Sequence, residues 1–289
     1  VIGAALARDR RVAGIAFTGS TDTARTINHT LATRNGPIVP FIAETGGQNA
    51  MIVDSSALPD QVVMDAMHSA FNSAGQRCSA LRVLFVQQDI SHRVLELLAG
   101  AMSEIRVADP IFLSTDVGPT IDESARKQLL DHLAYLRGCG HEIGSSPLPK
   151  EAVMGSFLAP HAFQIDNLER LKGEVFGPIL HVIPYAARYL DVVVETVNNT
   201  GYGLTLGVHS RIDDTIARVV ERARVGNIYV NRNMIGAVVG VQPFGGEGLS
   251  GTGPKAGGPN YLFRFATERT LSVNIAALGG NTQLLSLSD

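Results

Sequence analysis

Short apolar runs alternate with helical segments along this chain, and this alternation constrains its fold more than any other feature. Residues Val12–Phe17, Ile38–Ala43 and Ala50–Val53 are apolar, rich in β-branched or aromatic side chains and ended by polar residues or glycine, and Leu81–Val86 resembles a buried strand. Strands that are apolar on both faces and separated by helices predict a parallel sheet covered on both sides. We therefore predict an α/β fold.

Apolar periodicity and capping residues predict the helices. Ser20 can cap a helix over Thr21–Leu31, and Pro59 suits the first turn of a helix from Leu58 to about Ser73. Four further helices and two further strands are expected over Ser91–Ser103, Glu123–Arg137, Arg188–Asn199 and Asp213–Arg224, and over Gly226–Val230 and Leu271–Ile275.

Charge and cysteine content argue against several classes of function. The 289 residues carry 24 basic and 27 acidic side chains, a net charge of −3, without a basic run that could follow a phosphate backbone, so we expect no nucleic-acid binding. No apolar segment approaches the roughly 18 residues of a membrane span, so we expect no membrane insertion. Cys78 and Cys139 form no disulfide framework, and no signal peptide is visible, so a reducing, cytoplasmic setting is expected.

Glu44 is the first candidate for chemistry. It stands at the carboxyl end of a predicted strand, where open α/β sheets place their ligand crevices. The following Thr45-Gly46-Gly47 lets the backbone turn close to a bound group. A strand-end carboxylate is more often simply solvated, so its position makes Glu44 a candidate and assigns it no role.

Cys78 is the candidate nucleophile. It follows Arg77 in a polar turn between a helix and a strand, and a cationic neighbour can favour the reactive thiolate. The alternative is a small buried side chain without reactivity, which is the commoner fate of an intracellular cysteine. Cys139 also has polar neighbours, but we expect it in a surface loop without a strand end or a carboxylate to assist it, so it ranks below Cys78.

Two glycine-containing segments could bind an anion. Gly19 and Ser20 begin a predicted helix, whose free N–H groups and dipole favour negative charge. The segment 246–251 matches the dinucleotide fingerprint G-x-G-x-x-G, but no strand leads tightly into it and Pro254 interrupts the helix that should follow, so we reject this match. The histidines at positions 132, 141, 161 and 181 lack metal-ligand spacing, so no metal site is expected.

Five motifs stand in order along the chain: Phe17-Thr18-Gly19-Ser20, Glu44-Thr45-Gly46-Gly47-Gln48-Asn49, Gly75-Gln76-Arg77-Cys78, Glu174-Val175-Phe176-Gly177-Pro178 and Gln242-Pro243-Phe244-Gly245-Gly246. In this order they resemble the motifs of the NAD(P)-dependent aldehyde dehydrogenase superfamily. Within the superfamily, Ser79, the segment 226–232 and the loop 235–240 resemble the glutamate γ-semialdehyde (1-pyrroline-5-carboxylate) dehydrogenases. The ending 279–287 resembles the bifunctional bacterial proline utilisation A proteins, in which this dehydrogenase follows an FAD-dependent proline dehydrogenase.

The resemblance implies a fold and a role for each site residue. The fold would be aldehyde-dehydrogenase-like, with a partial Rossmann-type NAD domain and an α/β catalytic domain. Cys78 would be the nucleophile, Glu44 the general base, Glu174 the ligand of the nicotinamide ribose, and Phe176 part of the nicotinamide pocket. The rest of the implied site comprises Gly19 and Ser20 at the pyrophosphate, Ser79, Gly236 and Ala237 at the substrate carboxylate, and Phe244 against the aliphatic part of the substrate.

The implied reaction is the NAD-dependent oxidation of L-glutamate γ-semialdehyde to L-glutamate, the second step of proline catabolism. It would pass through a thiohemiacetal and a thioester on Cys78. Glu44, with a pKa raised by partial burial, would deprotonate the water that hydrolyses the thioester.

The resemblance also implies a division of the chain. Residues 1–46 would be the C-terminal half of the NAD domain, residues 47–254 the catalytic domain, and residues 255–289 a tail that contacts other subunits of a homo-oligomer. The superfamily's oxyanion asparagine and adenine-ribose lysine would precede Val1, so the isolated chain is expected to bind NAD poorly. FAD is implied only if a proline dehydrogenase domain lies upstream, and such a domain could instead belong to a partner chain.

Three alternatives stay open. The chain could be a dehydrogenase of another aldehyde. It could also be a non-catalytic fragment that serves assembly, with Leu271–Ile275 as a strand that pairs with a neighbouring subunit. The third is a cysteine hydrolase with a Cys–His pair, although no histidine stands in a motif. The sequence does not determine the preference for NAD or NADP, or the oligomeric state.

Overall fold

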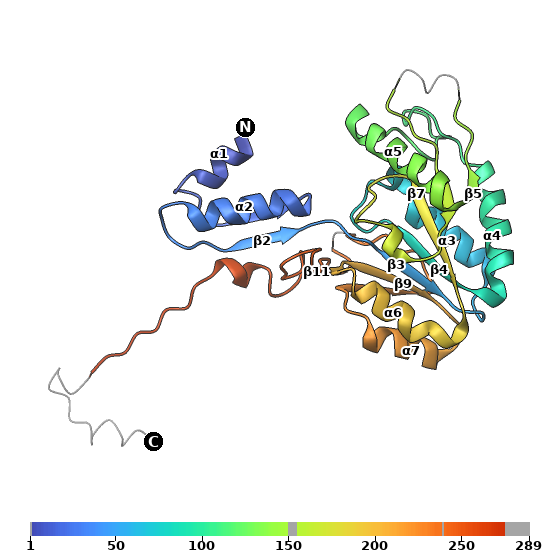
Figure 1. Ribbon diagram of the computed structural model, residues 1–289. Helices are drawn as coiled ribbons and strands as arrows, with labels where there is room; N and C mark the ends of the chain where they lie inside the picture. The colour runs from blue at the N-terminus through green and yellow to red at the C-terminus, as the bar shows by residue number, and fades with distance from the viewer. Residues whose placement is uncertain (1, 150–154, 239, 275–289) are drawn as a thin grey trace.

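The structure is a computed structural model that describes residues 2–149, 155–238 and 240–274 (Figure 1). A seven-stranded sheet with helices on both faces forms the larger unit, and the N-terminal residues form a smaller unit to one side of it. The predicted α/β fold with a mostly parallel sheet is therefore confirmed.

The strands of the large sheet stand in the order β10-β9-β3-β4-β7-β6-β5. Their bounds are Ala50–Val53 (β3), Val83–Gln87 (β4), His141–Ser145 (β5), His161–Gln164 (β6), Ile179–Tyr185 (β7), Thr205–His209 (β9) and Asn227–Val230 (β10). β5 pairs with β6 in the antiparallel sense, and the other five pairings are parallel. Strands β5, β6, β7 and β9 were not among the predicted elements.

Helices cover both faces of this sheet, and its strands are apolar on both sides for that reason. Helices α3 (Pro59–Phe71) and α4 (Gln88–Ser103) pack in one buried cluster, and α5 (Glu123–Cys139), α6 (Leu190–Asn198) and α7 (Asp213–Arg222) pack in the other. Successive strand residues alternate between the clusters: Met51 and Val53 of β3 join the first, and Ala50 and Ile52 the second. None of the helices in the described residues has the length and apolar composition that a membrane crossing needs.

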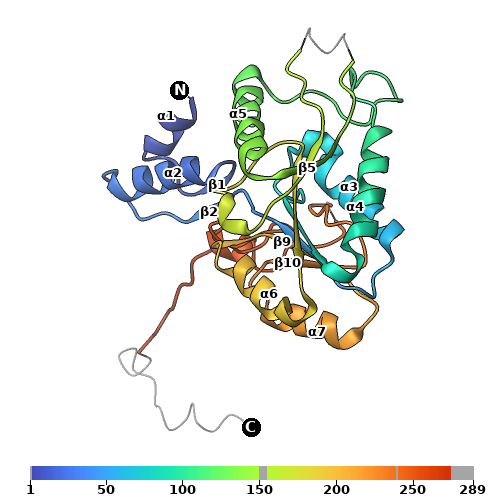
Figure 2. The same ribbon diagram turned by 45° about the vertical axis from the view of Figure 1, so that its right-hand side comes forward.

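The smaller unit consists of α1 (Ile2–Arg8), β1 (Ile15–Thr18), α2 (Thr21–Thr33) and β2 (Phe41–Glu44), and β1 and β2 pair in parallel. Ser20 caps α2 as predicted, since its Oγ accepts a hydrogen bond from the Thr23 N–H at 3.2 Å. Figure 2 shows the helices of this unit beside the strands that lead into the larger sheet.

The C-terminal part of the chain returns to join the two units. Strands β8 (Tyr202–Gly203) and β11 (Glu247–Gly248) pair in the antiparallel sense, and Gly251 forms a bridge with Glu44 at the end of β2. Phe244 forms a second bridge, with Ala256. The short helix η5 (Leu262–Phe265) follows.

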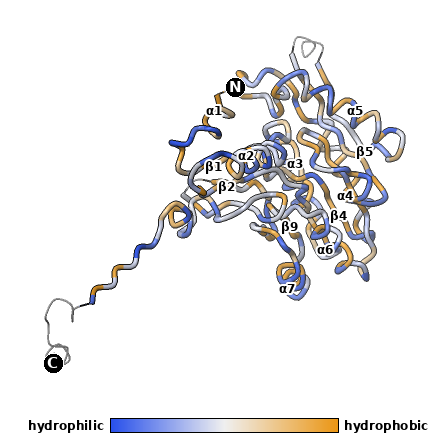
Figure 3. The backbone as a smooth tube through the Cα atoms, turned by 60° about the vertical axis from the view of Figure 1, so that its left-hand side comes forward, coloured by the Kyte–Doolittle hydropathy of each residue, from blue (hydrophilic) through white to orange (hydrophobic). Residues whose placement is uncertain are grey.

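The predicted strand Leu271–Ile275 is wrong for the residues that the structure describes, since 271–274 form no strand, and Ile275 lies outside the described residues. Leu271 and Val273 are 81% and 58% exposed, and Figure 3 shows hydrophobic and hydrophilic residues along this extended tail. A strand needs a neighbouring strand for its backbone hydrogen bonds, and this segment has none among the described residues.

Candidate active site

The candidate catalytic residues meet where the strands of the smaller unit end and those of the large sheet begin. Glu44 is the last residue of β2, and Cys78 lies in the loop that precedes β4. Burial raises the pKa of the Cys78 thiol, and the charges of Glu174 and, less strongly, Glu44 add to this, so both carboxylates lie within electrostatic reach of the thiol. The site thus occupies the junction between two sheets.

Glu44 has the environment of a general base. Its Oε2 accepts a hydrogen bond from the Gly246 N–H at 2.9 Å, while Oε1 is buried without a hydrogen-bond partner among the described residues. Burial raises the pKa of this carboxyl to about 7, against the opposing effects of the Gly246 N–H and the Lys255 charge. One oxygen is thereby fixed and the other is able to accept a proton near neutral pH.

Cys78 lies in a loop that the surrounding residues hold in an uncommon conformation. Ser73, Ala74 and Gly75 have positive φ values of 56°, 54° and 64°, which non-glycine residues rarely adopt. The Asn49 amide donates hydrogen bonds to the carbonyl oxygens of Cys78 at 2.6 Å and Ala80 at 2.9 Å. The main chain of the candidate nucleophile is therefore held by Asn49, the last residue of the Glu44 motif.

The expectation that Arg77 favours the thiolate is wrong. The Arg77 side chain is exposed, and burial raises the pKa of the Cys78 thiol, with a further increase from the charge of Glu174. Exposure to water screens the Arg77 charge, so sequence adjacency does not give the thiol a cationic environment.

Glu174 is held against the Glu44 motif. Its carboxylate accepts hydrogen bonds from the Gly47 N–H and, at 3.4 Å, from Arg82 Nη2, and a Cβ added to Gly46 would collide with it. Burial raises the pKa of Glu174, and the Arg82 charge opposes this. Glu174 and the 44%-exposed Phe176 line a pocket of 680 Å³ beside α5.

Of the residues predicted to bind substrate, some are buried together and others are exposed. Gly236 is buried, and a Cβ there would collide with the Phe244 ring and the Tyr229 hydroxyl. Burial raises the pKa of Tyr229, and a smaller contribution from the charge of Cys78 indicates that the two side chains lie within electrostatic reach of each other. Ser79 is buried, whereas Ala237 is exposed with φ at +58°. Residue 239 of the predicted carboxylate loop lies outside the described residues.

The turn that is predicted to bind an anion, Gly19 and Ser20, is connected to Glu44. The Gly19 N–H donates to the Glu44 carbonyl oxygen at 3.1 Å, and Ser20 is exposed at the start of α2. The predicted cofactor turn and the predicted base are therefore joined through the backbone of adjacent strands.

Two contributing residues received no role from the sequence. Asn49 closes the Glu44 motif and binds the Cys78 loop, as described above. Arg82 is the largest side chain exposed by less than 2%, and it contacts both the Cys78 loop and Glu174. The sequence signal for Arg82 was its charge inside the apolar run Leu81–Val86. A charged side chain is buried in a protein only with partners, so such a position indicates a network of contacts.

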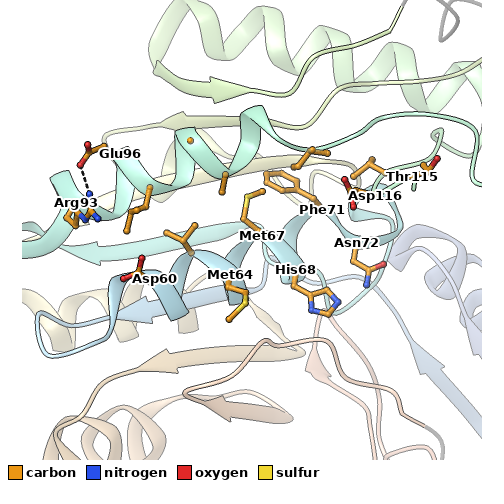
Figure 4. A pocket seen from close by; sticks show the side chains of 16 residues that line it. Asp60, Met64, Met67, His68, Phe71, Asn72, Arg93, Glu96, Thr115 and Asp116 are labelled. Carbon is orange, nitrogen blue, oxygen red and sulfur yellow. Dashed lines mark hydrogen bonds and ion pairs between the residues drawn. The ribbon is translucent and has the colours of Figure 1, made fainter. Parts of the chain in front are cut away.

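The remaining cysteine and a second cavity lie elsewhere. One histidine, His132, lines the same pocket as Glu174 and Phe176. Cys139 ends helix α5 rather than lying in a surface loop, and its Sγ donates to the Tyr135 carbonyl oxygen. His132 pairs with His181 at 2.9 Å, and the described residues contain no group of three side chains that could hold a metal ion. The cavity of 940 Å³ between α3 and α4 (Figure 4) includes none of the predicted site residues.

Comparison with known proteins identifies the family. The model of the aldehyde dehydrogenase family matches residues 1–271. The bifunctional protein PutA of Klebsiella aerogenes is 54% identical over 276 residues, which are 93% of this chain and 21% of that protein. The 1-pyrroline-5-carboxylate dehydrogenase of Geobacillus sp. (strain WCH70) is 34% identical over 276 residues, which are 94% of this chain and 53% of that protein.

Solved structures agree. A Bradyrhizobium japonicum proline utilization A variant has a TM-score of 0.91 at 57% identity, over 96% of this chain and 28% of that chain. A Thermus 1-pyrroline-5-carboxylate dehydrogenase with bound NAD has a TM-score of 0.83 at 33% identity, over 91% of this chain and 51% of that chain. The chain thus spans about a fifth of the bifunctional Klebsiella protein and half of the Geobacillus dehydrogenase. The resemblance seen in the motifs is confirmed: this chain belongs to the aldehyde dehydrogenase family.

Proposed function

We propose that this chain carries the catalytic cysteine and general base of an NAD-dependent dehydrogenase that oxidises L-glutamate γ-semialdehyde to L-glutamate. The observation that carries the proposal is that the motif beginning at Glu44 contacts both other segments, since Asn49 binds the Cys78 carbonyl oxygen at 2.6 Å and Gly46 packs against the Glu174 carboxylate. The names of the relatives, bifunctional PutA and 1-pyrroline-5-carboxylate dehydrogenase, support the substrate.

The residues present fit NAD. Glu174 is fixed on one side by Gly47 and Arg82 and lines a pocket on the other, so its carboxylate can accept hydrogen bonds from ribose hydroxyls, with Phe176 beside them. Gly19 and Ser20 would bind the pyrophosphate at the start of α2. The chemistry that NAD supplies when bound is acceptance of a hydride.

The protein's own residues perform the covalent steps. The Cys78 thiolate attacks the aldehyde carbon and forms a thiohemiacetal, which becomes a thioester when the carbon is oxidised. Glu44 then takes a proton from water through its unpartnered Oε1, and the resulting hydroxide attacks the thioester carbon. The C–S bond breaks, the carboxylic acid leaves and the thiolate is restored.

The substrate's far end would be recognised by the loop around Gly236. A carboxylate can be bound by backbone N–H groups of Gly236 and Ala237 together with the Ser79 hydroxyl. Because Gly236 has no side chain, Phe244 and Tyr229 pack directly against it. Phe244 would pack on the aliphatic part of the substrate.

The pKa of Glu44 predicts the pH dependence of thioester hydrolysis. Only the carboxylate accepts the proton, so hydrolysis should be fast above pH 7 and fall by about tenfold per pH unit below it. The decay of acetyl-Cys78, formed with p-nitrophenyl acetate, measures this step without NAD. A decay rate that does not change between pH 5.5 and 8.5 would remove Glu44 from the role of base.

An aldehyde panel tests the substrate. Glutamate γ-semialdehyde should have a kcat/KM about 10²-fold or more above that of butanal, because butanal cannot occupy a site built for a carboxylate. NADH formation by the full-length protein measures this ratio. Equal kcat/KM values for the two aldehydes would contradict the assigned substrate but not the aldehyde dehydrogenase activity. The absence of NADH formation with every aldehyde would contradict the dehydrogenase activity itself.

Several further properties stay predictions. These are a division of the chain into domains at residues 46 and 254, a homo-oligomer, a cytoplasmic location, and a proline dehydrogenase domain with FAD upstream or in a partner chain. Lys255 and Ala256 contact Asn227 and Phe244, so the first residues beyond 254 pack on the larger unit.

A further inference from the structure

We propose that Arg82 is a positioning residue that fixes the Cys78 loop against the Glu174 loop and gives both loops one shared positive charge. The inference rests on the proposed function, because Glu174 matters to the reaction only if it binds the cofactor. Arg82 itself would touch neither substrate nor cofactor.

The guanidinium of Arg82 bridges two segments that are far apart in the sequence. On the Cys78 loop, Nη1 donates to the Gly75 carbonyl oxygen at 2.6 Å and Nη2 to the Arg77 carbonyl oxygen at 3.1 Å. On the other loop, Nη1 contacts the Gly177 carbonyl oxygen at 3.3 Å and Nη2 contacts Glu174 Oε1 at 3.4 Å. Each terminal nitrogen thus joins one loop to the other.

This bridge depends on the planar shape of arginine. The side chain is only 1% exposed, so its contacts are not replaced by water. Phe176 lies 5.2 Å from the guanidinium carbon, measured to the ring centroid, which adds a cation–π contact with the loop that carries Glu174. A lysine ammonium keeps the charge, but as a point charge on a flexible stem it cannot fork between four acceptors.

The Cys78 loop needs such a fastening. Its residues Ser73 and Ala74 have positive φ values, which strain the backbone of a non-glycine residue. A Cβ at Gly75 would collide with the Gly177 carbonyl and lie 2.8 Å from the Ala70 carbonyl oxygen. The two loops are therefore already in contact, and Arg82 holds the strained one in place.

Arg82 is itself anchored by its backbone. Its N–H donates to the Asn49 carbonyl oxygen at 3.0 Å, and its carbonyl oxygen accepts from the His181 N–H at 3.0 Å. His181 Nδ1 lies 2.9 Å from the same oxygen, and because a carbonyl only accepts, this nitrogen carries a proton. The side chain extends from a fixed point between β3 and β7.

The charge of Arg82 acts on both functional groups. Burial and the charge of Glu174 both raise the Cys78 pKa, and burial raises the Glu174 pKa. Burial lowers the pKa of Arg82, and Glu174 and, less strongly, the charge of Cys78 oppose this, while Arg82 in turn lowers the Glu174 pKa. The guanidinium stays protonated at neutral pH, so it favours the thiolate and the carboxylate together.

Two substitutions separate charge from shape. Arg82→Met removes both, and Arg82→Lys keeps only the charge. Leu98→Ala, in a fully buried core residue of α4, is the control for a loss of stability outside the site. All three variants are made in the full-length protein, and their stabilities are compared by thermal unfolding.

The rate at which iodoacetamide alkylates Cys78 measures how the charge of Arg82 affects the thiolate. The alkylation rate of Cys139 is the internal reference. At pH 8 we expect Arg82→Met to slow alkylation of Cys78 by about tenfold or more, which corresponds to a rise of one pKa unit, and Arg82→Lys to change it by less than about threefold. Leu98→Ala should leave the Cys78 rate unchanged. Equal Cys78 rates in Arg82→Met and Leu98→Ala would overturn the shared charge.

The binding of NAD⁺, measured by calorimetry, gives a second readout. Without Arg82 the Glu174 pKa rises further, so the dissociation constant of Arg82→Met should be about threefold or more higher at pH 6.5 than at pH 8.5, while those of wild type and Arg82→Lys change less. If Arg82→Met does not fold, Arg82→Lys still tests the bridge. Its kcat should fall about 10- to 100-fold from misalignment alone, and a wild-type kcat in Arg82→Lys would overturn the positioning role.

These outcomes are distinct from failure of the proposed function. Wild-type oxidation of glutamate γ-semialdehyde tests that function alone. Cys78 alkylation and NAD⁺ binding test Arg82 even if the enzyme prefers another aldehyde.

Discussion

Cys78→Ala is expected to lower NAD-dependent aldehyde oxidation by about 10⁴-fold or more, because no other group in the site can form the thiohemiacetal. The Cys78 main chain is fixed by Asn49, and its partly buried side chain is small, so the variant should fold and keep its NAD⁺ affinity. NADH formation measures the first effect and calorimetry the second.

Cys139→Ala is the matched control. Cys139 ends α5, and its Sγ donates only a weak hydrogen bond to Tyr135 at 3.4 Å, so this variant should retain activity within about twofold. Substantial oxidation by Cys78→Ala, or loss of activity only in Cys139→Ala, would show that the nucleophile is assigned to the wrong cysteine.

Glu44→Gln is expected to separate the two halves of the reaction. Glutamine keeps the shape of the side chain but cannot take a proton from water, so steady-state turnover should fall by about 10²–10⁴-fold. Acylation of Cys78 does not need this water, so a first burst of about one NADH per site should remain. Stopped-flow measurement of NADH distinguishes the burst from the slow steady state.

Glu247→Gln supplies the control for this variant, since Glu247 is exposed in the nearby strand β11. It should show no burst and near-normal turnover. A Glu44→Gln variant that loses the burst in proportion to its turnover would place Glu44 before the thioester and contradict its role in hydrolysis.

The fold could be predicted where local pattern and tertiary environment agree. Residues Ala50–Val53 form β3 as expected, because a run that is apolar at every position suits a strand buried on both faces. β7 was missed because His181 and Pro184 interrupt its apolar pattern, although His181 is fully buried with its Nδ1 bonded to Arg82. The partner that makes a buried histidine acceptable is not visible in the local sequence.

The reactive residues of the candidate site could be predicted from the sequence, but the charges that surround them could not. Glu44 was identified from the turn at the carboxyl end of its strand, which places a side chain at a sheet edge, and Cys78 from a polar turn between a helix and a strand. Arg77 was expected to act on Cys78 because it is adjacent, whereas the buried cation is Arg82. Its partners come from residues 75, 77, 174 and 177, and only the folded chain brings them together.

Mass spectrometry of Glu44→Gln, quenched after mixing with glutamate γ-semialdehyde and NAD⁺, tests the central claim most directly. We predict an acyl adduct on the peptide that contains Cys78. The adduct should form only in the presence of NAD⁺, and hydroxylamine should remove it, as expected for a thioester. No adduct, or an adduct on Cys139 instead, would contradict the assignment of this sulfur and this carboxylate to one reaction.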